Sequence, residues 1–203
     1  MSDSISRGGD VLRFFKRSLV ITATAGIFLG VLLALAAEKL DQVTTTDSFC
    51  TSCHTMQLVA EQGVYQRSTH RTTTTGIQAG CADCHVPRGL LPATWAHIRD
   101  GTRDLYVELT TDFTPQSWES RRTELAYGVR DRMLADDSRN CRSCHKTAAI
   151  KPKRERGQRQ HELAERSQVS CIGCHFDLVH KPVKPRESFL RKVQVETQRQ
   201  KKD

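Results

Sequence analysis

Eight cysteines and eight histidines carry most of the chemistry that this 203-residue chain can perform. All eight cysteines lie in four copies of the pattern Cys-x-x-Cys-His, at residues 50–54, 81–85, 141–145 and 171–175. In this pattern two thiols can bond the vinyl groups of a haem, and the imidazole that follows can bind the iron. A disulfide framework needs no such histidine, and zinc ligation does not fix one there. The sequence therefore predicts four covalently bound haems c, held by Cys50, Cys53, Cys81, Cys84, Cys141, Cys144, Cys171 and Cys174.

The remaining histidines could supply the second axial ligands of these haems. Outside the motifs the chain has His70, His97, His161 and His180. His70 follows Cys50 by 20 residues, and His161 follows Cys141 by 20 residues. Low-spin electron-transfer haems need a second axial ligand, usually His or Met. We expect His70, His161 and His180 to face motif histidines across the iron, although which histidine serves which iron stays open. The expected iron ligands are thus His85, His145, His175, His70, His161 and His180. For His97 a structural role is an equal alternative.

The spacing of the motifs indicates a duplicated two-haem unit. Their first cysteines are separated by 31, 60 and 30 residues, which is a pair, a long connection and a second pair. The first motif departs from this symmetry, because it continues as His54-Thr55-Met56 where the third continues as His145-Lys146-Thr147. A methionine at that position can bind iron and raise the reduction potential. The alternative is a methionine that only packs.

An uncharged stretch at residues 19–37 is long enough to cross a bilayer as a helix. Arg13, Lys16 and Arg17 precede it, and such a basic flank stays on the cytoplasmic side. We therefore expect a cytoplasmic segment at 1–18, a transmembrane anchor at 19–37, a periplasmic tetrahaem domain at 38–180 and a basic C-terminal tail at 181–203. A cleaved signal peptide ending near Ala36 is the alternative, but its apolar core is usually shorter.

Composition predicts a mostly α-helical domain with much irregular structure, organised by its haems. Mean hydropathy is −0.51 and aromatic residues make up 6% of the chain, so the porphyrins must supply most of the core. Helices are expected at Pro92–Leu109, which contains His97, and at Pro115–Ala135. The segment from Lys181 onward carries eight basic and three acidic residues. It is expected to be a solvated tail, or alternatively an electrostatic guide for an acidic redox partner.

Nearly the whole chain resembles one family of proteins. The matching stretches are Phe49–Met56, Cys84–Pro87, Asp137–His145 and Cys171–His175, together with the single anchor and the 31/60/30 spacing. On these features the chain resembles the NapC/NirT/NrfH family of membrane-anchored quinol dehydrogenases. The long central gap and the total length are more similar to the NapC/NirT branch.

The resemblance implies an unusual first haem. In the family the methionine of Cys-x-x-Cys-His-x-Met binds the iron, which implies Met56 rather than His54 here. A carboxylate from a later helix lies at the other face of that haem, and it matches Asp104. Family members often have a lysine seven residues before this aspartate, where this chain has His97. Residues seven apart share one face of an α-helix, so His97 and Asp104 are expected to form the quinol site, with His97 as proton acceptor.

The resemblance further implies a respiratory function at the bacterial inner membrane. The chain would oxidise quinol and pass electrons to a periplasmic reductase, with nitrate reductase favoured and nitrite or a similar substrate possible. A passive electron-transfer cytochrome, a quinone reductase running in reverse and a small-molecule reductase are the alternatives. A homodimer is possible, and no nucleic-acid partner is expected. The sequence leaves open the direction of electron flow and whether menaquinol or ubiquinol is used.

Overall fold

This computed structural model describes residues 3–199, and within them the side chains of residues 13–53 and 55–194. The chain divides into two units, residues 1–43 and 44–203. The residues described form helices, turns and irregular loops, without a strand. The expected mostly α-helical fold class with much irregular structure is therefore confirmed.

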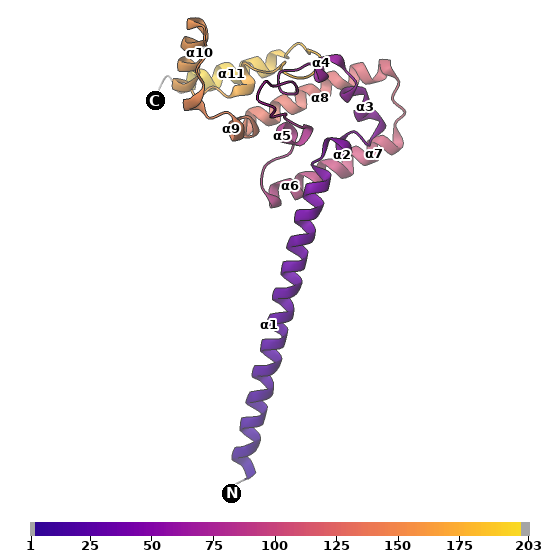
Figure 1. Cartoon of the computed structure of the whole chain (residues 1–203), viewed down its shortest axis with the longest axis vertical. Coiled ribbons are helices and arrows are strands. Elements are labelled where there is room, and N and C mark those ends of the chain that lie inside the picture. Colours follow the sequence, from indigo (N-terminus) through magenta and orange to yellow (C-terminus); the bar gives the residue numbers. More distant parts are fainter. Residues whose placement is uncertain (1–2, 200–203) are drawn as a thin grey trace. The chain divides into compact units, whose positions relative to one another are not determined.

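The first unit is one long helix, α1 (Asp3–Thr44) (Figure 1). Between Arg13 and Thr44 it is long and apolar enough to cross a membrane, and the expected anchor at 19–37 lies inside this range. Its apolar side chains are exposed, with Leu19 and Phe28 at 71% and 65%. A helix that shows apolar side chains on every side is suited to lipid rather than to water.

The second unit consists of short helices joined by irregular segments. They are α2 (Asp47–Cys50), α3 (His54–Ala60), α4 (Gly63–Gln66), α5 (Cys81–His85), α6 (Leu90–Ala96), the π-helical turn η1 (His97–Gly101), α7 (Thr102–Thr110), α8 (Pro115–Ala135), α9 (Arg139–Cys144), the 3₁₀ turn η2 (Thr147–Ala149), α10 (Glu155–Arg166), the 3₁₀ turn η3 (Cys171–Gly173) and α11 (Glu187–Arg199). Five of these elements contain or border the haem motifs: α2, α3, α5, α9 and η3.

The two helices expected between the second and third motifs are present. Helix α8 begins and ends at the expected residues, because the Thr114 side chain accepts the Ser117 N–H and Pro115 occupies the first helical position. The stretch from Pro92 to Leu109 is also helical, but the π-helical turn η1 divides it into α6 and α7. A π-turn contains one residue more than an α-turn and so changes the register of the helix.

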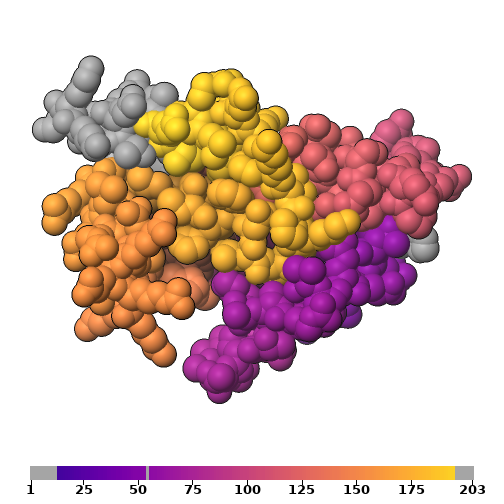
Figure 2. Space-filling view, turned by 90° about the horizontal axis from the view of Figure 1, so that it is seen from above, coloured from indigo at the N-terminus to yellow at the C-terminus, as the bar shows by residue number. Residues whose placement is uncertain are grey.

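A small core lies where α8 meets the C-terminal segment. Leu134, Ile172 and Phe189 are buried together, with Met133, Phe176 and Val193 against them. The residues expected as a solvated tail therefore include a buried Val183 and continue into α11, whose Phe189 is only 2% exposed. Phe189 and Val193 are four residues apart and give α11 one apolar side. Figure 2 shows this C-terminal segment, in yellow, between the orange residues of α10 and the pink residues of α8.

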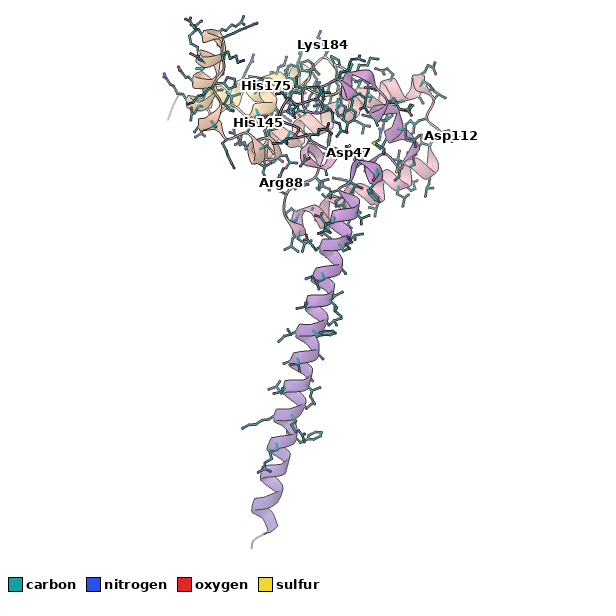
Figure 3. All side chains as sticks on the ribbon, in the orientation of Figure 1. Asp47, Arg88, Asp112, His145, His175 and Lys184 are labelled. Atoms are coloured by element: carbon teal, nitrogen blue, oxygen red, sulfur yellow. The ribbon has the colours of Figure 1, made fainter. Side chains whose placement is uncertain are left out.

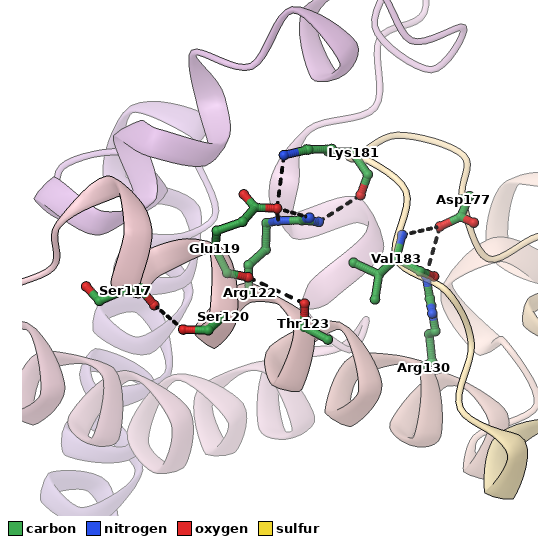
Figure 4. Close-up of polar contacts among 9 residues, drawn as sticks. All are labelled: Ser117, Glu119, Ser120, Arg122, Thr123, Arg130, Asp177, Lys181 and Val183. Atoms are coloured by element: carbon green, nitrogen blue, oxygen red, sulfur yellow. Dashed lines mark hydrogen bonds and ion pairs between the residues drawn. The ribbon is translucent and has the colours of Figure 1, made fainter.

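Ion pairs hold the loop after the fourth motif against α8 (Figure 4). The buried Arg130 side chain donates to Asp177 Oδ1 and to the Val183 carbonyl, each at 2.8 Å. Lys181 pairs with Glu119 at 3.0 Å, and Arg122 donates to the Lys181 carbonyl at 2.8 Å. His180 lies inside this loop, so these contacts decide where its imidazole is placed.

Candidate haem-binding and electron-transfer site

The second, third and fourth motifs each form one tight turn. The second is helix α5, and in the other two the histidine N–H donates to the carbonyl of the first cysteine, His145 to Cys141 at 2.8 Å and His175 to Cys171 at 2.9 Å. Residues three and four apart in such a turn lie on the same side. The two cysteines and the histidine of each motif therefore face one direction, as attachment to a single porphyrin requires.

The first motif is divided between two helices. Cys50 is the last residue of α2, and Cys53 is the extended N-cap of α3, which begins at His54. Met56 lies in the first turn of α3, where its N–H donates to the Cys53 carbonyl at 3.1 Å. The side chain of His54 lies outside the described residues, whereas Met56 is half-buried. This motif therefore differs from the other three in its backbone as well as in its sequence.

The histidines outside the motifs lie opposite motif histidines in three pairs. Ring centroids are 6.1 Å apart for His70 and His145, 6.1 Å for His85 and His180, and 6.0 Å for His161 and His175. Metal–imidazole bonds are about 2 Å long, so two imidazoles on opposite sides of one metal ion have ring centres roughly 6 Å apart. The three pairs have the separation that one iron between two imidazoles requires.

Three of these six imidazoles have a pKa below the ordinary value, which suits a metal ligand. Burial, followed by His180 and Arg132, lowers the pKa of His85 to about 4. Burial also lowers the pKa of His180, and burial followed by His161 and His145 lowers that of His175. Figure 3 labels His145 and His175 among the side chains of the second unit. Iron binds the neutral imidazole, which these low pKa values favour at neutral pH.

One histidine is also oriented by a second contact, and one motif borders a cavity. His161 Nδ1 donates to the Gly157 carbonyl at 2.9 Å, which leaves Nε2 free to bind a metal. A cavity of about 540 Å³ opens beside it; its lining includes His161, Cys174, His175, Lys153, Arg154 and Arg156. The three cations could pair with the propionates of a haem in this cavity. The residues present therefore fit a haem attached at the fourth motif.

Hydrogen bonds from side chains to the backbone join each pair of successive motifs. Asp47 Oδ1 accepts the Cys81 N–H at 2.7 Å, joining motifs one and two. Asn140 Nδ2 donates to the Val86 carbonyl at 2.8 Å, joining two and three. Ser138, only 1% exposed, accepts the Ile172 N–H at 3.0 Å and joins three and four. The motifs are therefore neighbours in the order of the sequence.

Of the expected quinol-site residues, His97 is the first residue of the π-turn and Asp104 follows the turn in α7. His97 Nδ1 donates to the Ala93 carbonyl at 2.9 Å, just as His161 Nδ1 donates to the Gly157 carbonyl, so the Nε2 lone pair of His97 stays available. Burial, followed by the charge of Asp100, raises the pKa of Asp104. The extra residue in the π-turn shifts all later residues around the helix axis by on the order of 100°. Residues seven apart, such as His97 and Asp104, therefore do not share one helix face as they would in a continuous α-helix.

Helices α6 and α7 expose a series of large apolar side chains. Leu91, Trp95, Ile98, Leu105, Tyr106 and Leu109 are all exposed. Leu91 and Leu109 are exposed to 80% and 76%. So many exposed apolar side chains on one short stretch indicate contact with an apolar partner or with lipid.

Sequence reasoning did not identify several residues that position the motifs. These are Asp47, Tyr65, Glu108, Ser138 and Asn140. Ser138 and Asn140 lie inside a stretch that matches the family, and Glu108 follows Asp104 by one helical turn. The family match could have indicated Ser138 and Asn140, and the helical spacing from Asp104 could have indicated Glu108. No neighbouring residue in the sequence indicates that Tyr65 stacks on His180.

Comparison with known proteins gives a consistent result. The family model for the NapC/NirT cytochrome c family, N-terminal region, matches residues 14–185. The chain is 37% identical to a tetraheme cytochrome c-type protein of Nitrosomonas europaea over 83% of this chain and 72% of that protein. It is 39% identical to a tetraheme cytochrome c-type protein of Allochromatium vinosum, over 77% and 85%. It is 33% identical to the denitrification system component NirT of Stutzerimonas stutzeri, over 85% and 89%.

No solved structure matches the chain. The family match nevertheless covers the anchor helix, all four motifs and the loop that carries His180. The relatives are named as tetraheme cytochromes, which agrees with the three imidazole pairs and with eight cysteines free of disulfide bonds. The chain belongs to the NapC/NirT cytochrome c family and is a membrane-anchored electron-transfer protein with four covalently bound haems c.

Proposed function

We propose that this cytochrome oxidises quinol at its first haem and passes the electrons to a periplasmic reductase. The division of the first motif between α2 and α3 is the observation that carries the proposal. It gives this haem a ligand environment unlike the three that have imidazole pairs. In the proposed orientation the N-terminus is cytoplasmic and the second unit is periplasmic, as the basic residues before the anchor favour.

The proposed iron ligands follow from the ring pairs. His85 with His180, His145 with His70, and His175 with His161 would each hold one iron between two imidazoles. At the first haem Met56 would be the ligand, because the division of the motif separates His54 from the turn that contains Cys50. The pKa of Cys53 is raised by burial, then by the charge of Glu108 and then by the charge of Asp104. Asp104 is therefore near Cys53 and would lie towards the open side of this haem.

Protons need an acceptor of their own in this reaction. A bound haem supplies one-electron transfer, whereas a quinol releases two electrons and two protons as it becomes a quinone. The Nε2 lone pair of His97 can take a proton, because Nδ1–H is engaged with the Ala93 carbonyl. Asp104 can accept a hydrogen bond from a quinol hydroxyl when ionised, and burial followed by the charge of Asp100 raises its pKa above the ordinary value.

The exposed apolar side chains of α6 and α7 suit a lipid-soluble substrate. Leu91, Trp95 and Ile98 follow one another at helical spacing just before and within the π-turn that begins at His97. A quinol tail could lie along them while the ring reaches His97. The links between successive motifs then support electron flow from the first motif to the fourth, where Lys153, Arg154 and Arg156 could meet an acidic partner.

The terminal reductase is proposed only as a class. Nitrate reductase is favoured by the resemblance to the NapC/NirT branch, and a NapC protein of Haemophilus influenzae is 31% identical over 80% of this chain. The denitrification system component NirT of Stutzerimonas stutzeri is also a relative. So is a TorC protein of Escherichia coli, of whose length 42% is matched. A nitrite or other periplasmic reductase therefore fits the same electron-transfer role.

Rapid mixing of the purified full-length protein with a reduced quinol tests the proposal. Asp104→Asn and His97→Ala should slow haem reduction by quinol about 10²–10⁴-fold, the usual cost of losing one group in a proton-coupled step. Neither should slow reduction by dithionite, and Asp112→Asn, in an exposed carboxylate outside the site, should change neither rate. A double variant that quinol reduces at the wild-type rate would refute this site and favour a passive electron carrier.

A further inference from the structure

Glu108 joins α7 to the first haem motif through both of its carboxylate oxygens. Its Oε1 accepts the Thr55 N–H at 3.1 Å, and its Oε2 accepts the Thr55 hydroxyl. Thr55 is only 5% exposed, and 53 positions separate the two residues in the sequence. Two hydrogen bonds from one residue to one carboxylate restrain both the place and the direction of that residue.

This contact acts on the segment that holds the candidate iron ligands of the first haem. Thr55 lies between His54 and Met56 in the first turn of α3. The N-cap residue Cys53 makes no side-chain capping bond, so Glu108 supplies the acceptor that the start of the helix needs. A negative charge also suits the N-terminal end of a helix. A side chain of α7, rather than the N-cap side chain of α3, therefore accepts the hydrogen bonds at the start of α3.

The same side of α7 carries the proposed partner of the first haem. Asp104 and Glu108 are one turn apart within α7, after the π-turn, so they lie on one face. Burial, followed by the charges of Glu108 and Asp104, raises the pKa of Cys53, which places both carboxylates near the first motif. Glu108 contacts Thr55, and Asp104 is left for the open side of the haem.

We propose that Glu108 is a positioning residue that sets the coordination of the first haem. By holding Thr55, it would keep the first turn of α3, which carries Met56, at a fixed separation from Asp104 in α7. The proposal rests on the proposed function in that α3 supplies an iron ligand and Asp104 lies beside the first haem. A seven-residue helix is marginal by itself, so release of Thr55 would let its first turn unwind and allow the ligand to exchange.

Four variants of the full-length protein test this role in detergent and without quinol. Glu108→Ala removes both bonds, and Glu108→Gln keeps them, because an amide can accept the N–H and donate to the hydroxyl oxygen. Thr55→Val removes only the hydroxyl bond and preserves the shape. Glu124→Ala is the matched control, in an exposed glutamate of α8. The ligands of the first haem are read by electron paramagnetic resonance and its potential by spectroelectrochemical titration.

Glu108→Ala should change the ferric signal of the first haem and lower its potential, because loss of methionine ligation lowers it. Thr55→Val should give a smaller change of the same kind. Glu108→Gln and Glu124→Ala should keep the wild-type ligand signal, while the three other haems stay low-spin in every variant. A general structural role would instead disturb several haems together.

A Glu108→Ala variant with the wild-type ligand signal would overturn the proposal. Equal changes in Glu108→Ala and Glu108→Gln would also overturn it, because charge and not geometry would then be responsible. If Glu108→Ala does not acquire four haems, Thr55→Val decides the question, and an unchanged signal there would refute the role. The readout uses no quinol, so a wild-type protein that quinol fails to reduce would refute quinol oxidation and leave this result intact.

Discussion

The ring of Tyr65 lies parallel to the imidazole of His180, with centroids 5.8 Å apart and an angle of 9° between the planes. Tyr65 is 7% exposed, its hydroxyl is 3.7 Å from Cys81 Sγ, and the Arg71 guanidinium lies 5.2 Å from its ring centroid. Tyr65 therefore contacts both His180, which lies opposite His85, and Cys81, which belongs to the same motif as His85. Tyr65 restricts the rotation of His180.

Tyr65→Leu should destabilise the protein by about 1–3 kcal/mol, because it loses the stacked ring and leaves space beside His180. It should also broaden the ferric signal of one low-spin haem, since the plane of that imidazole becomes less restricted. Tyr65→Phe keeps the ring and should change both properties much less. Denaturant unfolding and electron paramagnetic resonance check the pair, and equal effects of the two substitutions would contradict a role for stacking.

The ring pairs predict a count of low-spin haems. His70→Ala, His161→Ala and His180→Ala should each remove one low-spin signal, and any two together should remove two, because each histidine belongs to a different pair. Added imidazole should restore the lost signal by filling the vacated position. His97→Ala is the control and should leave every low-spin signal in place. Loss of a low-spin haem in that control would show that the ligand assignment is wrong.

Asp177 should be required for stability although it contacts no haem motif directly. It pairs at 2.8 Å with Arg130, whose side chain is 6% exposed. Asp177→Ala would leave a buried guanidinium without its carboxylate, which should cost about 2–4 kcal/mol of unfolding free energy. Asp112→Ala, in an exposed carboxylate, should change stability by less than about 0.5 kcal/mol. Guanidinium titration measures both, and similar values would contradict the importance of the ion pair.

The link between the first two motifs should depend on pH. Burial raises the pKa of Asp47, but the hydrogen bonds from Cys81 and the charge of Arg71 outweigh it and hold the pKa below its ordinary value of 3.8. A carboxyl with a lowered folded pKa stabilises the fold above its unfolded pKa, and this contribution disappears as pH falls through the folded value. Asp47→Asn should therefore be less stable than the wild type at pH 7, and the difference should shrink below about pH 4. A difference independent of pH would contradict this origin.

Trp95 should matter for quinols that reside in lipid. It is 62% exposed and lies two residues before His97. In proteoliposomes Trp95→Ala should slow haem reduction by a long-tailed quinol roughly 5–30-fold, which corresponds to a loss of one or two kcal/mol of apolar contact. Reduction by a short, water-soluble quinol should be little changed. Leu163→Ala, in an apolar residue of α10 that is 46% exposed, is the control and should affect neither.

Local signals in the sequence predicted the haem motifs, the anchor helix and α8. Thr114 and Pro115 mark the start of α8 directly, because capping and the first helical turn depend on neighbouring residues. The stretch 19–37 predicts a long helix from its composition alone. The histidines outside the motifs could be named as candidate ligands from the sequence, because so few residues could serve four irons, and their role as ligands stays a prediction.

The partners of these histidines could not be predicted, because pairing depends on the fold of distant segments. His70 meets His145 across 75 positions of sequence, and His85 meets His180 across 95. The π-turn at His97 was missed for a different reason, since a spacing of seven looks the same in either kind of helix. Helix α11 was not predicted because its many basic residues indicate a solvated segment, and only one side of the helix, which carries Phe189, is apolar.

The proposed ligation of one iron by His85 and His180 would also order the events of biosynthesis. A chain made and exported from its N-terminal end presents Cys81 and Cys84 long before residue 180 emerges. With His180 as its second ligand, the haem attached there would wait with a single protein ligand until nearly the whole chain had been exported. Truncation just before His180 would then damage a haem in the first half of the protein, and the cell could not mature that half as a separate polypeptide.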